Sequence, residues 1–320
     1  MTTALRFSAF GALLAASLAF TPPGHAEAPM AKSQAPGWYR MKLGQFEVTA
    51  LSDGSVAMPV DKLLTGIKPA TIEQLLARAY LKTPVETSVN GYLVNTGSKL
   101  VLIDAGAAGL FGPTLGKLLV NLKASGYQPE QVDEVYITHM HPDHVGGLVE
   151  GGKPAFPNAV VRADTREGGF WLDKAKLDAA PAAAKGGFEG AMASLNPYVA
   201  AGKFKAFDGE TELVPGIRAL PAYGHTPGHT LFVVESEGHK LVVWGDLMHV
   251  AAVQFAMPSA TMQFDSDSKA AAPQRAKNYA DAAQKGYYVA VAHISFPGIG
   301  KLRADGKGYQ WVPANYNSAP

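Results

Sequence analysis

Residues 138–144 read Thr-His-Met-His-Pro-Asp-His and directly follow an apolar run that ends at Ile137. Imidazole nitrogen and carboxylate oxygen are the ligands that zinc and its first-row neighbours accept in proteins. Without a metal, crowding these groups together would cost hydration and form no compensating bond. A polar turn after a strand would not need this spacing, so the stretch predicts a metal site. The candidate ligands within it are His139, His141, Asp143 and His144.

The first 26 residues have the composition of a secretory signal peptide. One cation, Arg6, precedes an apolar stretch over residues 7–20, and a short polar segment leads to Ala26. A membrane anchor is the weaker interpretation, because a spanning helix needs about 20 apolar residues. We therefore predict cleavage after Ala26, a periplasmic or secreted protein with no membrane anchor after cleavage, and an N-terminal extension over residues 27–43.

Composition limits the remaining possibilities. The chain has no cysteine, so it has neither disulfides nor thiolate metal ligands. The formal charge of +1 becomes 1 − 1 = 0 when Arg6 leaves with the signal peptide, and there is no basic run, which argues against nucleic acid as a partner. With 47% hydrophobic residues and no low-complexity linker, residues 44–320 are predicted to form one domain. The expected partner is a small molecule of low charge.

Short strands and helices alternate along this domain. Residues 45–51 predict a half-buried strand and residues 52–54 a turn, while residues 91–98 and 99–104 predict a hairpin. Residues 179–190, rich in Ala, Lys and Gly, are interpreted as a surface loop or lid. Further strands are predicted at 134–138, 159–162, 216–220, 230–234, 240–244 and 287–292, and helices at 113–124 and at 269–284, the latter capped by Asp267 or Ser268. This alternation predicts an α/β fold with both faces of its sheets covered by helices.

Polar clusters follow three of the later strands. The sequence Gly-His-Thr-Pro-Gly-His at 224–229 follows one strand, Asp246 follows the next and His293 follows the last. Loops at strand ends of α/β folds are held rigidly at one edge, so distant residues can converge there. The prediction is a two-metal site with seven ligands. His139, His141 and His229 hold the first ion, Asp143, His144 and His293 hold the second, and Asp246 bridges them together with a hydroxide. His225 is predicted to order its turn or to support a ligand from behind.

These motifs in this order resemble the metallo-β-lactamase superfamily. The resemblance runs from Gly44 to the end of the chain and implies an α/β fold of the αβ/βα type, a four-layer sandwich. Within the superfamily the chain is similar to the methyl parathion hydrolase group of exported organophosphate hydrolases and related lactonases. The segments that carry this similarity are 86–94, 107–115, 191–198 and 293–300. The resemblance also implies a homodimer.

The resemblance further implies an aromatic pocket for the leaving group, at Phe111, Trp171 and Phe188. From the residues alone, each of these side chains would be expected to pack onto the core. Because all three occur in matching local sequence, the pocket interpretation is preferred.

Other positions bear on the choice of substrate. His249 and Met262 fall in segments that line the same pocket in the group, and an imidazole there would disfavour bulky apolar phosphotriesters. Leu63 stands where the organophosphate specialists are expected to have a basic residue, which argues against strong methyl parathion activity. Asp104, at the end of a buried strand, is either a structural cap or, as the resemblance implies, the group that orients a ligand imidazole.

The predicted reaction follows from the two ions, for which zinc is the first expectation although the ligand set also accepts cobalt, manganese or iron. Two divalent ions about 3.5–4 Å apart lower the pKa of a bridging water, and the resulting hydroxide attacks a carbonyl carbon or a phosphorus. Asp246 and Asp143 are the predicted catalytic residues, and either Asp143 or a pocket hydroxyl would supply a proton to the departing alkoxide of a lactone.

The leading hypothesis is a metal-dependent hydrolase of lactones, aryl esters and organophosphate triesters. A glyoxalase II-like thioesterase shares the metal motif, but the sequence shows no basic cluster suited to glutathione. A non-catalytic metal-binding protein is the alternative outside enzymes, and the presence of all seven predicted ligands argues against it. A β-lactamase with a thiolate ligand is excluded because the chain lacks cysteine.

Overall fold

The computed structural model describes residue 1 and residues 28–318. The predicted signal peptide, residues 1–26, therefore lies outside the described residues apart from Met1. The described residues from Pro36 onward form one compact unit. Residues 28–35 contain no helix or strand. Among the described residues, no helix has the length and apolar character needed to cross a membrane.

The first sheet has six strands in the order β1-β2-β4-β5-β6-β9. Their bounds are β1 Trp38–Leu43, β2 Phe46–Met58, β4 Val85–Asn95, β5 Leu100–Ile103, β6 Glu134–Tyr136 and β9 Val160–Arg162. The pairs from β1 to β5 are antiparallel, including the predicted hairpin of β4 and β5, while β5, β6 and β9 run parallel. Strand β1 lies inside the predicted extension 27–43, and the sheet thus begins within that segment.

The second sheet has seven strands in the order β10-β11-β12-β13-β15-β16-β17. Their bounds are β10 Thr211–Val214, β11 Ile217–Pro221, β12 Thr230–Ser236, β13 His239–Val243, β15 Tyr288–Ala290, β16 Ile299–Asp305 and β17 Gly308–Pro313. All neighbours are antiparallel except β13 and β15, which are parallel. The parallel pair matters for function because both of its strands end at the same edge of the sheet.

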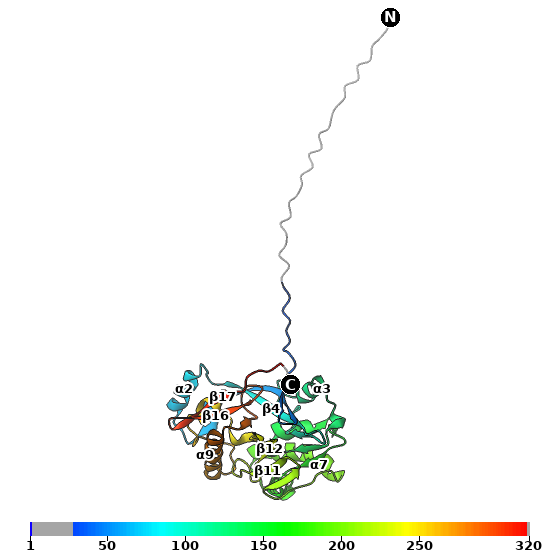
Figure 1. Ribbon diagram of the computed structural model, residues 1–320, viewed down its shortest axis with the longest axis vertical. Coiled ribbons are helices and arrows are strands. Elements are labelled where there is room, and N and C mark those ends of the chain that lie inside the picture. Colours follow the sequence, from blue (N-terminus) through cyan, green and yellow to red (C-terminus); the bar gives the residue numbers. More distant parts are fainter. Residues whose placement is uncertain (2–27, 319–320) are drawn as a thin grey trace. The chain divides into compact units, whose positions relative to one another are not determined.

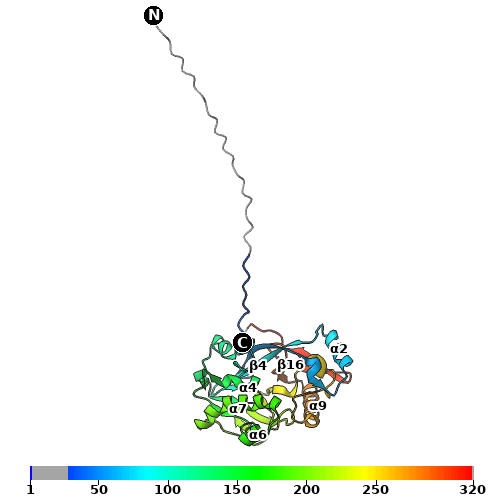
Figure 2. The ribbon, with the colours of Figure 1, turned by 180° about the vertical axis from the view of Figure 1, so that it is seen from behind.

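The two sheets pack face to face, with helices on their outer faces (Figure 1). Helices α3 (Leu118–Ala124) and α7 (Ala182–Ala200) lie on one side and α9 (Ser268–Lys285) on the other, as the view from behind also shows (Figure 2). The buried core between the sheets joins Val48 and Val94 of the first to Phe232 and Val243 of the second. This arrangement confirms the αβ/βα four-layer sandwich. The prediction that helices cover both faces of each sheet is wrong, because the inner face of each is covered by the other sheet.

Shorter elements connect these layers. The helical ones are α1 Val60–Leu63, α2 Pro69–Arg78, α4 Pro142–Val145, α5 Thr165–Trp171, α6 Lys174–Ala179 and α8 Ala251–Gln254, with 3-10 turns η1 Pro129–Gln131, η2 Gly146–Leu148 and η3 Gly245–Leu247. Two small ribbons, β3 Leu64–Thr65 with β14 Thr261–Met262 and β7 Val149–Glu150 with β8 Lys153–Pro154, complete the fold.

Two local predictions near the first sheet are wrong. Residues 52–54 form no turn, since β2 continues through them with a shift in register between Ser52 and Gly54. The carboxylate of Asp53 accepts hydrogen bonds from the backbone N–H groups of Ala107, Gly116 and Leu118. It thereby fixes the loop before α3, and this helix begins at Leu118 rather than at residue 113. Aspartate is common in turns, so the sequence of this segment does not reveal that Asp53 binds backbone groups far along the chain.

The predicted lid over residues 179–190 is also wrong, because most of it is the first half of α7. Alanine is the strongest helix former, and it outweighs the neighbouring glycines once Phe188 and Leu195 are buried against the first sheet. Helix α9 agrees with its prediction, and Asp267 caps it by accepting hydrogen bonds from the N–H groups of Lys269 and Ala270.

Candidate metal centre

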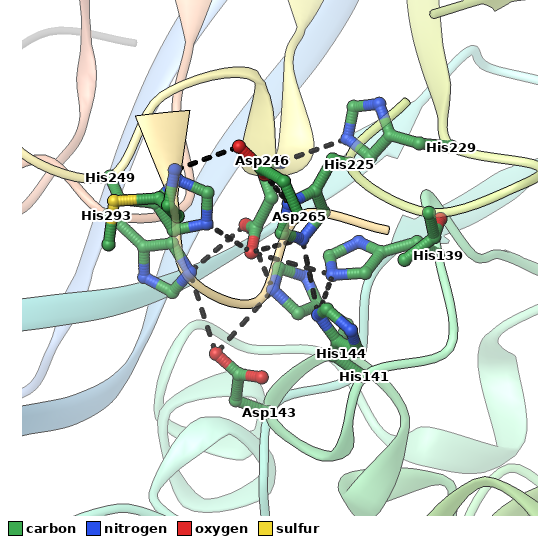
Figure 3. A network of polar contacts seen from close by, with 12 residues as sticks. His139, His141, Asp143, His144, His225, His229, Asp246, His249, Asp265 and His293 are labelled. Carbon is green, nitrogen blue, oxygen red and sulfur yellow. Dashed lines mark hydrogen bonds and ion pairs between the residues drawn. The ribbon is translucent and has the colours of Figure 1, made fainter. Parts of the chain in front are cut away.

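The predicted ligand residues from both sheets meet where strands end, around the carboxylate of Asp246 (Figure 3). The first sheet contributes the loop after β6 and helix α4, which carry the cluster 139–144. The second sheet contributes the segments after β11, β13 and β15, which carry His225, Asp246 and His293. Parallel strands deliver their carboxyl ends to one edge of a sheet, so loops distant in sequence become neighbours.

A first group of four residues has ligand atoms within 4.8 Å of one another: His139, His141, His225 and Asp246. The Nδ1 atom of His141 lies 3.0 Å from Nε2 of His139 and 3.2 Å from Nε2 of His225. The Oδ2 atom of Asp246 lies 3.4 Å from Nε2 of His139 and 3.3 Å from Nε2 of His225. Three imidazoles and one carboxylate oxygen thus face a common point.

A second group consists of Asp143, His144 and His293. The Oδ2 atom of Asp143 lies 3.6 Å from Nε2 of His144 and 3.5 Å from Nε2 of His293. The same two imidazole nitrogens lie 3.1 and 3.0 Å from Oδ1 of Asp246. Asp246 therefore directs one oxygen toward each group, as predicted for a bridging carboxylate.

The structure directs the rings of His225 and His229 differently from the sequence expectation. His229 was expected as a ligand, but its Nε2 accepts a hydrogen bond from the backbone N–H of Asp246 at 3.0 Å, and its Nδ1 lies 3.2 Å from the carbonyl oxygen of Ala222. Both ring nitrogens of His229 are thus occupied by backbone groups. His225 instead directs Nε2 into the first group, while its Nδ1 lies 2.8 Å from Oδ1 of Asp265.

Burial and protonation in the centre fit a metal site. The Nε2 atom of His144 and the Oδ1 atom of Asp246 are buried and have no hydrogen-bond partner among the described residues. Burial lowers the pKa of His139 and His141, so both are neutral and present lone pairs. Burial alone would raise the pKa of Asp246, but the neighbouring His144 and His293 outweigh it and hold that pKa well below its usual range. Burial alone would lower the pKa of His144, His225 and His293, but the neighbouring carboxylates outweigh it and raise all three, so these imidazoles would release a proton when a metal ion binds.

A carboxylate behind the second group orients His144. The Oδ2 atom of Asp104 lies 2.8 Å from Nδ1 of His144, which leaves Nε2 free to face the centre. Asp104 also accepts hydrogen bonds from the backbone N–H and the hydroxyl of Thr138. Of the two interpretations left open for Asp104, the structure therefore supports the one in which it orients a ligand imidazole. Carboxylates in this position fix the tautomer and direction of a metal-binding histidine.

Glu167 of α5 holds the first group together, although nothing in the sequence pointed to it. Its side chain is 0% exposed and accepts hydrogen bonds from the backbone N–H groups of Met140 and Gly228 and from the hydroxyl of Thr226, each at 2.8 Å. Burial raises the pKa of Glu167, and these donors oppose that rise. A lone glutamate in a short helix carries no local signal for such a role.

His249 lies in the centre rather than in a pocket wall. Its Nε2 atom is 2.9 Å from Oδ2 of Asp246, and its ring stacks on that of His293 with centroids 5.3 Å apart. Asp246, His249 and His293 form a third group that could hold a metal ion. The sequence analysis expected His249 in a pocket wall and did not anticipate its direct contact with Asp246.

The three predicted aromatic pocket residues occupy different environments. Trp171 packs edge-on against His141, with ring centroids 5.3 Å apart, and lies 4.8 Å from Phe188. Phe188 is only 4% exposed and belongs to the core beneath α7, so it supports Trp171 instead of lining a pocket. Phe111 is 46% exposed on the loop before α3.

An aromatic residue that the sequence analysis missed stands over the histidines. Phe264 is 36% exposed, and its ring centroid lies 5.1 Å from that of His249, 5.9 Å from His225 and 6.3 Å from His141. Met262, predicted as a pocket residue, is only 1% exposed and packs with the half-buried Leu63 in a separate apolar cluster. An exposed phenylalanine against three imidazoles is a natural contact for an apolar substrate.

Comparison with known proteins agrees with this site. Residues 84–285 match the family described as the Metallo-beta-lactamase superfamily. An N-acyl homoserine lactonase of a Bacillus species is 30% identical over 165 residues, which are 46% of this chain and 58% of that relative. A second, from Bacillus cereus, is 29% identical over 40% of this chain and 42% of its own length. The chain thus spans about half the length of these relatives.

Two solved structures cover nearly all of the folded unit. The hydrolase AbOPH of the beta lactamase superfamily is 39% identical, with a TM-score of 0.85 over 89% of this chain and 100% of that one. AidC, a dizinc quorum-quenching lactonase in complex with a product, is 27% identical, with a TM-score of 0.80 over 88% of this chain and 99% of that one. This protein belongs to the metallo-β-lactamase superfamily. Its fold, its His and Asp groups and its relatives place it among the metal-dependent hydrolases of that superfamily.

Proposed function

We propose that this protein is an exported, dinuclear metal hydrolase that opens lactones and also cleaves aryl esters and organophosphate triesters. The observation that carries the proposal is Asp246, whose two oxygens face two separate groups of neutral or metal-competent side chains. The lactone preference is supported by the relatives, two of which are named as N-acyl homoserine lactonases and one as a dizinc lactonase.

In this proposal each group holds one divalent ion. His139, His141 and His225 bind the first, Asp143, His144 and His293 bind the second, and Asp246 contacts both. Zinc is the proposed metal, because nitrogen-rich sets of this kind suit zinc and one similar structure is described as dizinc. Two such ions would supply a hydroxide nucleophile at neutral pH and polarise the substrate oxygen.

The protein side chains then position the substrate and manage the proton. Asp143 has 14% of its side chain exposed, against 3% for Asp246, so Asp143 is the carboxylate that a substrate can reach. Ring opening of a lactone releases an alkoxide that needs a proton. We assign the transfer to Asp143, whose carboxylate would accept the proton carried by the attacking hydroxide and pass it to the ring oxygen as the ring C–O bond breaks. Phe264 and Trp171 flank His141 and would contact the apolar part of the substrate.

The same surroundings favour a lactone over a bulky phosphotriester. Phe264 and His249 lie against each other above the centre, and their rings restrict the space beside Asp246. Leu63, which is half-buried in an apolar cluster, adds no charge that would bind a polar triester group. Aryl esters share with lactones a planar carbonyl group of small volume, so we propose that they are hydrolysed as well.

A substrate panel tests the proposed function. The zinc-loaded protein should hydrolyse an N-acyl homoserine lactone and an aryl ester faster than an aryl phosphotriester, and all three faster than S-lactoylglutathione. Two tightly bound ions without turnover of any of these compounds would contradict the proposal and favour a metal-binding protein. Preference for S-lactoylglutathione would identify a thioesterase instead.

Export and assembly are separate parts of the proposal. Export is supported by the composition of residues 1–26, and the N-terminal sequence of the mature protein from the periplasm or medium would test cleavage after Ala26. The homodimer remains a prediction, which light scattering of the purified protein would check.

A further inference from the structure

The first ligand group draws its histidines from the loops of two different sheets. His139 and His141 follow β6 of the first sheet, whereas His225 follows β11 of the second. The ion affinity of this group therefore depends on how firmly the two loops are held together. A backbone hydrogen bond from Thr230 to the carbonyl oxygen of Thr138 forms part of this connection. Glu167, which lies on neither loop, provides a second connection.

Glu167 uses one oxygen for each loop. Its Oε1 accepts the N–H of Met140, the residue between the two histidines of the first loop. Its Oε2 accepts the hydroxyl of Thr226, which directly follows His225, and the N–H of Gly228, three residues after His225 in the second loop. The side chain of Glu167 thus spans from one loop to the other at the level of the ligands.

The second loop approaches α5 so closely that only glycine fits. A Cβ atom at Gly228 would lie 2.4 Å from the backbone nitrogen of Glu167 and 2.7 Å from its Cβ. This contact accounts for the second glycine of the Gly-His-Thr-Pro-Gly-His sequence at 224–229. Asp164 caps α5 by accepting the N–H of Arg166, which holds the start of this helix in place.

A buried carboxylate is costly unless its oxygens are satisfied by donors. Glu167 meets this condition mainly through donors from the two ligand loops, with a further side-chain interaction from Trp171 of α5 itself. The second ligand group does not depend on it in the same way, since His144 is oriented by Asp104 and His293 by the carbonyl oxygen of Ser88. Loss of Glu167 should accordingly affect the two groups unequally.

We propose that Glu167 is a positioning residue that joins the two loops and sets the affinity of the first group for its ion. This inference rests on the proposed two-metal site. Glu167 touches none of the proposed metal ligands' ring nitrogens, so it acts through Met140, Thr226 and Gly228.

The test is Glu167→Gln in the full-length, zinc-loaded protein. A glutamine oxygen can still accept the N–H of Met140, but its amide group then faces the N–H of Gly228, donor against donor. We expect one of the two ions to be released at about 10–100-fold lower chelator concentration than in the unchanged protein, while the other is retained as before. Metal content after equilibration with increasing chelator gives this readout, and far-ultraviolet circular dichroism checks the fold.

Two further variants separate positioning from general destabilisation. Thr226→Val removes only one donor to Glu167, so the same ion should be released, but with a smaller shift. Glu134→Gln, which alters a buried glutamate paired with Arg162 at 2.6 Å, is the matched control and should release both ions as the unchanged protein does.

The outcomes distinguish this inference from the proposed function. Equal retention of both ions in Glu167→Gln, or equal loss of both in a folded protein, would overturn the positioning role. If the unchanged protein binds fewer than two ions, the two-metal site itself fails. If Glu167→Gln does not fold, unchanged metal release in Thr226→Val would overturn the inference.

Discussion

The two halves of the metal centre are built in different ways. The first sheet supplies its ligands from residues 139–144, one loop and one short helix, whereas the second sheet supplies single residues from three separate strand ends. The ligands from the first sheet are neighbours in the sequence, so their proximity to one another depends little on the tertiary structure. The second half exists only when β11, β13 and β15 are in place. The following predictions test this difference, from the largest expected effect to the smallest.

Asp246, from the second sheet, directs one oxygen toward each ligand group, so its loss should have the largest effect. Asp246→Ala removes the oxygen facing each group, and both ions and all lactone hydrolysis should be lost together. Metal analysis and lactonase assays of the folded variant check this. Asp281→Ala, on the outer helix α9, is the control and should keep both ions. Full activity of Asp246→Ala would refute the two-metal mechanism.

The paired histidines of the second sheet give the sharpest comparison. His225→Ala should release one ion and abolish most of the activity, because Nε2 of His225 faces the first group. His229→Ala should retain both ions with about 10–100-fold weaker affinity or activity, because His229 only holds the backbone of Asp246. Metal content separates the two outcomes. Loss of an ion from His229→Ala, but not from His225→Ala, would restore the assignment made from the sequence.

Substitution of Phe188 and of Phe264 should have different effects, because Phe188 packs in the core and Phe264 is proposed to contact the substrate. Phe188→Ala empties a buried site and should lower the free energy of unfolding by about 3–5 kcal/mol. Phe264→Ala removes an exposed ring beside the histidines, so we expect little change in stability and a several-fold higher KM for lactones with apolar chains. Urea unfolding and steady-state kinetics measure these effects. A KM unchanged by Phe264→Ala would exclude that side chain from the substrate site.

The metal-free protein should become less stable as the pH rises. Burial alone would lower the pKa of His225, but Asp246 and Asp265 outweigh it and raise that pKa to about 9. Protonated His225 then stabilises the folded state below pH 6.5, the ordinary value, and this contribution is lost as the pH rises through about 9. Urea unfolding of the metal-free protein below pH 6.5 and above about pH 9 measures the loss in the free energy of unfolding. Asp265→Asn should reduce the difference, and a rise in stability with pH would contradict the assignment.

Much of the fold was predictable from local patterns. The β4–β5 hairpin and α9 with its Asp267 cap occur where apolar periodicity and capping chemistry place them. Asp53 was misinterpreted as a turn residue because its partners lie far along the chain. The helix at 182–200 was missed because glycines obscured its alanine content, while burial of Phe188 stabilises it.

The candidate site likewise contains residues that local sequence predicted and residues that it did not. Six of the seven predicted ligands lie in the groups of side chains that could hold a metal ion, each after the strand from which it was expected. The sequence assigned His229 as a ligand and His225 as its support, whereas the structure directs Nε2 of His225 toward the first group. Both residues follow the same strand, and tertiary packing sets the direction of each ring. Glu167 and Phe264 gave no signal, because their roles arise from contacts with residues distant in sequence.

The sequence by itself determined the superfamily and the His and Asp residue types of the candidate metal centre, because these depend on residue types at fixed spacing within loops. The tertiary structure alone decided which imidazole of the 224–229 segment faces the centre, which carboxylate joins the loops and which ring covers the site. These choices depend on the meeting of two sheets, whose packing fixes directions that no local spacing encodes.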